Sequence, residues 1–121
     1  ALNSVAANTW RPIEVIIVYQ GAEDQRWDEL QRIANDLSPL SVSLLRNPKS
    51  GDRRAENLNI GWEFGRGRFI GFLDDDDTLE SKHIQLLVEA MVATGHTWAY
   101  SQTLLRKEDE EFRIVSETRP F

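Results

Sequence analysis

The segment Arg68–Asp77 (RFIGFLDDDD) most constrains how this chain can fold, because a short apolar run leads directly into four consecutive aspartates. The apolar part is rich in Phe, Ile and Leu and is too short for a helix, which predicts a buried strand. The acidic part then falls at the carboxyl end of that strand. In open α/β sheets, ligands bind at this end of the strands.

The four carboxylates of Asp74–Asp77 repel one another, so each resists ionisation unless a positive charge compensates it. Divalent cations such as Mg²⁺ prefer oxygen ligands and are the usual compensation. Since residues i and i+2 of an extended backbone point to the same side, we predict that Asp74 and Asp76 converge on one ion, while Asp75 and Asp77 point elsewhere. The alternative is a solvated acidic loop in which Asp77 only supplies charge to a helix N-terminus.

The composition indicates one globular domain or part of one, since 121 residues with 40% hydrophobic content can bury a core. A net charge of −6 argues against sequence-independent nucleic-acid binding, which needs a basic face. The absence of Cys excludes disulfides, thiol catalysis and zinc–thiolate sites. With no apolar run near the roughly 20 residues that span a bilayer, and no visible signal peptide, we expect a cytoplasmic location or one at the cytoplasmic face of a membrane.

Apolar periodicity predicts helices that alternate with strands. The expected helices cover residues 1–8, 24–37, 52–64 and 81–94, and the expected strands cover residues 13–18, 41–45, 68–73, 97–105 and 112–115. Asp24 is the expected N-cap of the second helix, and Gly95 the C-cap of the fourth. This alternation specifies an α/β fold with a mainly parallel sheet and helices on both faces.

Three of the predicted helices carry apolar residues at helical spacing, which predicts their core-facing sides. These residues are Trp27, Leu30, Ile33, Ala34 and Leu37, then Ala55, Leu58 and Trp62, and finally Ile84, Leu87, Val88, Met91 and Val92. Asn57, Asn59 and Gly61 are poor helix formers within the third helix. Their presence predicts close packing or a polar contact there.

Four stretches in this order resemble the nucleotide-sugar-binding half of family 2 glycosyltransferases, which have the GT-A (Rossmann-like) fold. Ser4–Trp10 followed by Ile13–Val18 resembles the family's first helix and second strand, and Gly21–Asp24 resembles its Gly-Ser-Thr-Asp turn. Asn59–Gly61 resembles its Asn-x-Gly helix, and Phe72–Asp77 its Asp-x-Asp (DXD) strand end. The likeness covers about 95 residues, and no single motif in it is specific.

The resemblance implies a glycosyltransferase that uses a nucleotide-diphosphate sugar, most simply a UDP-sugar, with Mg²⁺ or Mn²⁺ as cofactor. It implies metal binding by Asp74 and Asp76, and contacts from Asp74 and Asp75 to the nucleotide sugar. Arg54, with Arg53, is expected to contact phosphate, although both residues can equally be solvated surface arginines. The resemblance also implies an acceptor, which it does not identify further than a saccharide, a lipid or a protein.

Two departures from the family pattern qualify this expectation. Tyr19 and Gln20 stand where the family usually has Asp residues, one of which contacts the nucleotide base. Gln20 is therefore expected to hydrogen-bond a base edge, and Tyr19 to stack on the base. A non-catalytic domain that keeps the fold and binds a partner is the alternative. A phosphoryl-transfer or receiver-type domain ranks below both, because no lysine follows a predicted buried strand.

The second departure is length. The family's first strand would precede Ala1, so Ile13–Val18 would keep an unpaired edge. The acceptor site and the general base are expected after residue 121, since Asp109–Glu111 fits a solvated turn better. Residues 1–121 are therefore expected to be a partial GT-A nucleotide-sugar-binding domain, within an oligomer or a longer polypeptide, with no catalytic residue assigned.

Overall fold

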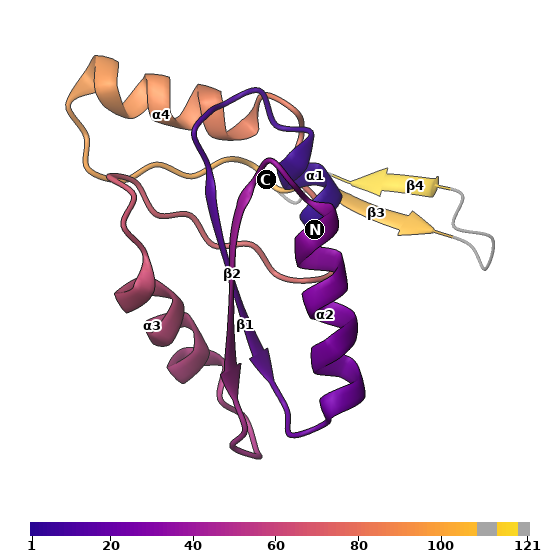
Figure 1. Cartoon of the computed structure of the whole chain (residues 1–121). Helices are drawn as coiled ribbons and strands as arrows, with labels where there is room; N and C mark the ends of the chain where they lie inside the picture. Colours follow the sequence, from indigo (N-terminus) through magenta and orange to yellow (C-terminus); the bar gives the residue numbers. More distant parts are fainter. Residues whose placement is uncertain (109–113, 119–121) are drawn as a thin grey trace. The chain divides into compact units, whose positions relative to one another are not determined.

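The computed structural model describes residues 1–108 and 114–118 of the chain, which forms two units, Ala1–Gln85 and Leu86–Phe121. The elements run in the order α1 (Leu2–Ala6), β1 (Glu14–Gln20), α2 (Asp24–Asp36), β2 (Ser41–Asn47), α3 (Arg54–Phe64), α4 (His83–Thr94), β3 (Leu105–Glu108) and β4 (Ile114–Thr118) (Figure 1). The first unit holds everything up to the start of α4. The second holds the rest of α4 and the β3–β4 pair.

The first unit is built on a parallel pair of strands, β1 and β2, as the β-branched run Ile13–Val18 predicted. Their register runs from Glu14 opposite Ser41 to Gln20 opposite Asn47, so both strands end at the same edge. Helix α3 packs on β1 and α2 packs on β2. Figure 1 shows the two helices on either side of the strand pair. The predicted α/β arrangement, with a parallel sheet and helices on both faces, is therefore confirmed.

The prediction of a buried strand at residues 68–73 is wrong. The segment has no regular secondary structure, and Phe72 is 56% exposed. A strand needs a neighbouring backbone to accept and donate its hydrogen bonds. In the described part of the first unit, β1 and β2 pair only with each other, and this segment does not pair with the free edge of either strand. Its Phe72 ring instead stacks on Trp62 of α3, with 5.9 Å between ring centroids.

Several residues predicted to face the core are exposed. They are Ile33 of α2, Ala55, Leu58 and Trp62 of α3, and Val92 of α4. The strands β1 and β2 cover only part of the apolar stripes of α2 and α3, which leaves the outer positions of these two helices in solvent. Among the described residues, the buried hydrophobic side chains are Val5 and Val88.

The helix ends agree with the sequence in one case and differ in another. Gly95 ends α4 with a positive φ of 72°, as its C-cap role predicted. Glu23, and not Asp24, is the N-cap of α2, and it makes no side-chain cap hydrogen bond. Asp24 is the first helical residue, and its carboxylate accepts a 2.9 Å hydrogen bond from Arg46 of β2. The Asp24 carboxylate is therefore engaged with β2 and not with the first backbone N–H groups of the helix.

The second unit contains less strand than predicted. Of the expected strand 97–105 only Leu105 is in β3, which pairs antiparallel with β4. Residues 97–104 lack a partner strand, and the exposed rings of Trp98 and Tyr100 stack on each other 5.7 Å apart. Residues 106–108, which follow the expected strand, also belong to β3. Residues 109–113, which include Asp109–Glu111 and the start of the predicted last strand, lie outside the described residues.

The start of α4 is capped by a residue far away in the sequence. The buried Asn8 donates from Nδ2 to the carbonyl of Glu80 at 3.0 Å, and its Oδ1 accepts from the backbone N–H of Ile84 at 3.3 Å. Ser4 Oγ accepts from the backbone N–H of Leu79 at 3.0 Å. Ser4 in the first helix and Asn8, two residues after its end, therefore hold the segment that follows the aspartates.

Gly61 gives α3 its close approach to β1, as the sequence predicted. A Cβ atom added at Gly61 would lie 3.5 Å from Val18 Cγ2, which leaves room for a methyl group and little more. We expect Gly61→Ala to stabilise the helix by about 0.5–1 kcal/mol. Gly61→Leu should destabilise the fold by about 1–3 kcal/mol through overpacking. Urea unfolding of the two variants measures both, and equal midpoints would contradict this packing.

Within the described residues, no helix has the length and apolar character needed to cross a membrane.

Candidate functional site

The carboxyl ends of β1 and β2 present different side chains on the two faces of the sheet. Tyr19 lies opposite Arg46, and Gln20 lies opposite Asn47. Because successive residues of a strand point to opposite faces, each pair occupies its own face. The Tyr19 ring lies 6.3 Å from the ring of Trp27 of α2, while Gln20 faces α3. The two residues proposed for base recognition thus lie on opposite faces, with Tyr19 packed toward α2.

On the α3 face, three side-chain amides form a continuous hydrogen-bonded chain. Gln20 Nε2 donates to the carbonyl of Gly51 at 2.6 Å, and Gln20 Oε1 accepts from Asn57 Nδ2 at 3.1 Å. Asn57 Oδ1 accepts from Asn47 Nδ2 at 2.7 Å. Asn47 Oδ1 accepts from the backbone N–H of Lys49 at 3.2 Å. This amide chain (Gln20, Asn57 and Asn47) connects β1, α3, β2 and the loop at 48–53.

Sequence reasoning found only part of this amide chain. The polar contact predicted from Asn57 as a poor helix former is confirmed, because its side chain bridges two strands. The predicted strand 41–45 stops short of Asn47, which is the last residue of β2 and is only 3% exposed. A buried Asn at a strand end indicates a polar contact, but the partner of Asn47 lies ten residues away on a helix. Local patterns do not show such a contact.

The four aspartates form a turn rather than the end of an extended strand. The backbone N–H of Asp77 donates to the carbonyl of Asp74 at 3.2 Å, an i to i+3 hydrogen bond typical of a β-turn. Three of the carboxylates, from Asp74, Asp76 and Asp77, each place an oxygen within 4.8 Å of the others. Asp74 and Asp76 converge as predicted. The prediction that Asp77 points elsewhere is wrong, because the turn ends the two-residue alternation and brings its carboxylate back.

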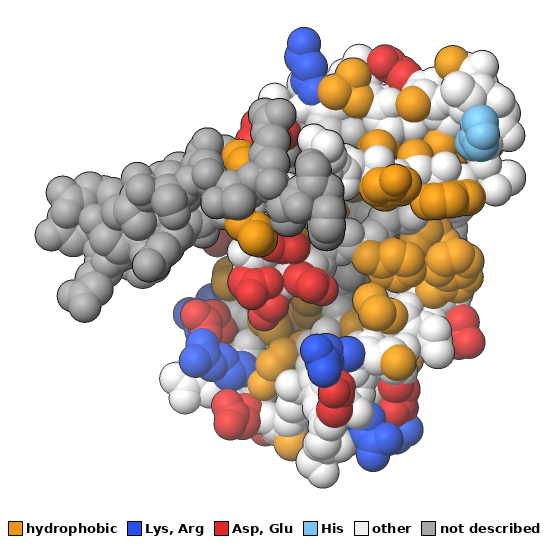
Figure 2. Space-filling view, turned by 180° about the vertical axis from the view of Figure 1, so that it is seen from behind, with side chains coloured by type: hydrophobic (Ala, Val, Ile, Leu, Met, Phe, Trp, Pro, Cys, Tyr) orange, Lys and Arg blue, Asp and Glu red, His pale blue; other side chains and the backbone are white. Residues whose placement is uncertain are grey.

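The aspartate group (Asp74, Asp76 and Asp77) fits a hard divalent cation. All three side chains are exposed, and each offers a carboxylate oxygen. Mg²⁺ is commonly held by one or two carboxylates, with water and phosphate oxygens as the other ligands. An exposed group leaves room for those additional ligands. Figure 2 shows acidic side chains gathered on one face of the molecule, with hydrophobic side chains exposed on the same face.

Arg54 begins α3 and is held by a neighbouring carboxylate. Its Nε and Nη2 donate to the two carboxylate oxygens of Asp52 at 3.1 and 2.7 Å, and its backbone N–H also donates to Asp52. These bonds raise the pKa of Arg54, and the negative charge of Asp74 contributes further. Arg54 is therefore in the electrostatic field of the aspartate group.

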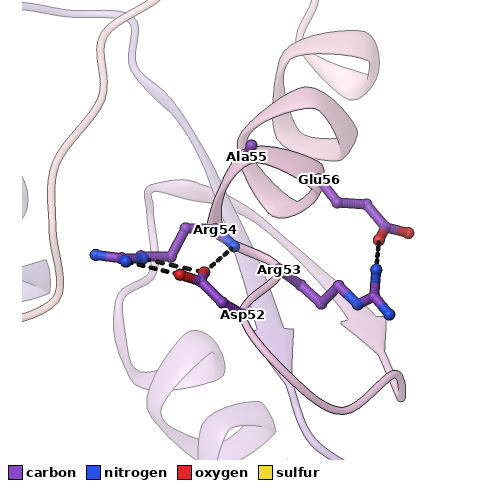
Figure 3. A pocket seen from close by; sticks show the side chains of 5 residues that line it. All are labelled: Asp52, Arg53, Arg54, Ala55 and Glu56. Carbon is purple, nitrogen blue, oxygen red and sulfur yellow. Dashed lines mark hydrogen bonds and ion pairs between the residues drawn. The ribbon is translucent and has the colours of Figure 1, made fainter.

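Arg53 takes a separate role at the same helix end. Its Nε donates to the carbonyl of Ser50 at 3.1 Å, and its Nη1 lies 3.8 Å from the carboxylate of Glu56. Both arginines line an open hollow at the start of α3, together with Asp52, Ala55 and Glu56 (Figure 3). In Figure 3 the two guanidinium groups point in different directions. Only Arg54 is thus a candidate for contacts near the aspartate group.

The Asp52–Arg54 pair should make the hollow sensitive to strong acid. Hydrogen bonds from Arg54 lower the pKa of Asp52 to about 2 from its usual 3.8. A carboxyl with a lowered folded-state pKa contributes stability above its unfolded pKa and loses that contribution as the pH falls through the folded value. We expect the Asp52 carboxyl carbon to titrate near pH 2 by NMR. In Arg54→Ala it should titrate near pH 3.8, and an unchanged midpoint would contradict the pairing.

Known proteins that resemble the chain are enzymes of sugar transfer. The model of the protein family described as "Glycosyl transferase family 2" matches residues 1–120 of the chain. The chain is 27% identical over 108 residues to a GalNAc(5)-diNAcBac-PP-undecaprenol beta-1,3-glucosyltransferase of Campylobacter jejuni, covering 89% of this chain and 34% of the relative. It is 30% identical over 88 residues to a glucosyl-dolichyl phosphate glucuronosyltransferase of Haloferax volcanii, covering 73% of this chain and 27% of the relative.

A third relative is similar over a stretch of nearly the same length as the first. It is the UDP-Glc:alpha-D-GlcNAc-diphosphoundecaprenol beta-1,3-glucosyltransferase WfaP of Escherichia coli, 25% identical over 107 residues, which are 88% of this chain and 41% of the relative. The chain therefore spans between about a quarter and two fifths of the length of these relatives. No solved structure matches it. The chain belongs to glycosyl transferase family 2, and its parallel β1–β2 pair with flanking helices represents part of that family's GT-A fold.

Proposed function

We propose that the chain is the donor-binding part of a glycosyltransferase that transfers a sugar from a nucleotide-diphosphate sugar. The observation that carries the proposal is the convergence of three carboxylates, from Asp74, Asp76 and Asp77, in a chain of this family. The acceptor part and the general base then belong to another stretch of a longer polypeptide or to a further subunit. The short share of each relative that the chain covers supports this division.

Each site residue has a role in this proposal. Asp74 and Asp76 hold Mg²⁺ or Mn²⁺, with Asp77 as a further oxygen ligand. A cation bound there supplies positive charge that neutralises the diphosphate leaving group. Asp74 and Asp75 hydrogen-bond the donor through carboxylate oxygens that the cation does not use. Arg54, already held by Asp52, places its guanidinium to bind a phosphate oxygen.

Base recognition is assigned to Gln20. Its amide lies at the carboxyl end of β1 and offers both a donor and an acceptor to a base edge. We assign uridine to the donor, because the name of one relative specifies UDP-Glc as its substrate. Stacking on the base by Tyr19 is not kept in the proposal, because its ring packs toward Trp27 on the other face of the sheet.

The acceptor and the location follow from the names of the relatives. Undecaprenol- and dolichyl-linked compounds are named for three of them. We infer that a lipid-linked saccharide is the acceptor, ahead of a free saccharide or a protein, and that the enzyme works at the cytoplasmic face of a membrane. No role for nucleic acid is proposed, given the net charge of −6.

The test is a calorimetric titration of the protein with UDP, with and without Mn²⁺. We expect binding that depends strongly on Mn²⁺, because the aspartate group and a diphosphate repel each other unless a cation lies between them. UDP binding that is the same with and without Mn²⁺ would refute a cation held by the aspartates. Absence of UDP binding in both conditions would refute donor binding itself.

A non-catalytic domain is the second candidate. The observation that favours it is the amide of Gln20 and the phenol of Tyr19 at positions where the family usually has carboxylates. Such a domain should show no rise in melting temperature with UDP and Mn²⁺ together, since a ligand raises stability only where it binds the folded state. A rise that needs both additions would exclude this candidate.

A further inference from the structure

The amide chain has a fixed direction, because backbone groups anchor both of its ends. At one end the N–H of Lys49, which can only donate, bonds to Asn47 Oδ1. At the other end the carbonyl of Gly51, which can only accept, receives Gln20 Nε2. Every amide between these anchors must therefore present its oxygen toward the Lys49 end and its NH₂ toward the Gly51 end. One amide cannot turn over alone without bringing two oxygens or two NH₂ groups together.

The direction of the amide chain matters because the Gln20 amide keeps hydrogen-bonding capacity beyond its bonds to Gly51 and Asn57. Its NH₂ has two hydrogens, of which one goes to Gly51, and its oxygen has two lone pairs, of which one accepts from Asn57. One hydrogen and one lone pair remain. The side chain is half-buried at the strand end, so these two groups can reach a ligand. Which side offers the hydrogen and which the lone pair is set by residues that lie behind Gln20.

We propose that Asn57 and Asn47 are positioning residues that fix the orientation of the Gln20 amide and thereby select the nucleotide base. This inference rests on the proposed donor site. Uracil has an N–H at N3 beside a carbonyl at C4, whereas cytosine has a bare acceptor nitrogen at N3 beside an amino group. An amide of fixed orientation complements one of these edges and opposes the other. A freely turning amide would serve both.

Asn57→Asp should reverse the Gln20 amide without changing Gln20 itself. The new carboxylate still accepts from Asn47, but it can no longer donate to Gln20. Gln20 then turns its NH₂ toward residue 57, because a hydrogen bond to a carboxylate is stronger than one to a carbonyl. The cost is two oxygens facing each other at Gly51. That loop position has open space around it, so the loop can move or admit water.

The experiment measures the dissociation constants of UDP and CDP with Mn²⁺ for the full chain and three variants. We expect the unchanged protein to prefer UDP, and Asn57→Asp to shift the UDP-to-CDP preference toward CDP on the order of tenfold. Asn57→Ala releases Gln20 and should move the preference part of the way. Asn59→Asp adds the same charge at an exposed position of α3 and should weaken both ligands equally.

The outcomes separate this inference from the proposed function. A shifted preference in Asn57→Asp and Asn57→Ala, but not in Asn59→Asp, supports the positioning role. UDP binding with an unchanged preference in every folded variant overturns the positioning role and leaves the donor site intact. Absence of UDP and CDP binding in the unchanged protein overturns both. If Asn57→Asp melts below the assay temperature, the half-way shift in Asn57→Ala decides the question.

Discussion

Replacing both Asp74 and Asp76 by Asn should weaken Mn²⁺-dependent UDP binding by about 100-fold or more, and either single change, or Asp76→Ala, by at least about tenfold. An amide keeps the size of a carboxylate but loses the negative charge that offsets the cation's dehydration. The effect should be confined to the Mn²⁺-dependent part of the binding. Calorimetric titration of UDP with and without Mn²⁺ measures it.

The matched control for this prediction is Asp36→Asn. Asp36 is an exposed carboxylate at the end of α2, so its replacement changes the net charge by one unit, as Asp74→Asn or Asp76→Asn alone does, without touching the aspartate group. Asp77→Asn tests whether Asp77 contributes to binding of the cation, since the turn from Asp74 to Asp77 places its carboxylate with the other two. We expect Asp77→Asn to weaken Mn²⁺-dependent UDP binding less than Asp76→Asn and more than Asp36→Asn. Equal losses in Asp76→Asn and in Asp36→Asn would show that net charge alone is responsible.

Asn8→Ala should cost about 1–3 kcal/mol of unfolding free energy, because it removes the acceptor of a backbone N–H beside a buried side chain. The N–H of Ile84 loses Asn8 Oδ1, in a place where the Asn8 side chain is only 4% exposed. The carbonyl of Glu80 loses the Asn8 donor but keeps a 2.9 Å hydrogen bond from the backbone N–H of His83, so its loss adds little. Urea unfolding followed by Trp fluorescence measures the loss.

Asn3→Ala is the control for Asn8→Ala. Asn3 is an exposed residue of α1, so the same truncation is made in the same helix region without uncovering a buried group. We expect its effect to lie within about 0.5 kcal/mol of zero. A loss in Asn8→Ala no larger than that in Asn3→Ala would mean that water takes over both hydrogen bonds. The capping role of Asn8 would then be discarded.

The elements that could be predicted are those whose signal is local. The run Ile13–Val18 is β-branched, and it forms β1 within a residue or two of the predicted bounds. Spacing in Trp27–Leu37 gives α2, and Gly95 marks the end of α4. Each of these signals acts within one turn or one strand. The parallel arrangement followed because helices alternate with the two strands.

The strand predicted at residues 68–73 shows why local signals are not sufficient. Its residues have strand propensity, but a strand forms only if another backbone lies beside it. The sequence of the segment alone does not determine whether such a partner is present. The prediction that Asp77 points away from Asp74 and Asp76 failed for the same reason, because the i, i+2 rule holds only for an extended backbone and these residues form a turn. The roles of Asn8, Asn47 and Asn57 were also out of reach in detail. Their partners lie on other elements, and polar contacts of that kind depend on the assembled structure.

The second edge of β1 has a consequence for the isotope exchange of its amides. In the described residues β1 pairs on one side only, with β2. Backbone N–H groups of a strand alternate between its two sides, so within the seven residues of β1 every second amide lacks a cross-strand acceptor. Deuterium uptake should therefore rise and fall with a period of two along Glu14–Gln20. A strand from elsewhere in a longer polypeptide, or from a second copy, would erase that alternation by slowing the fast amides alone.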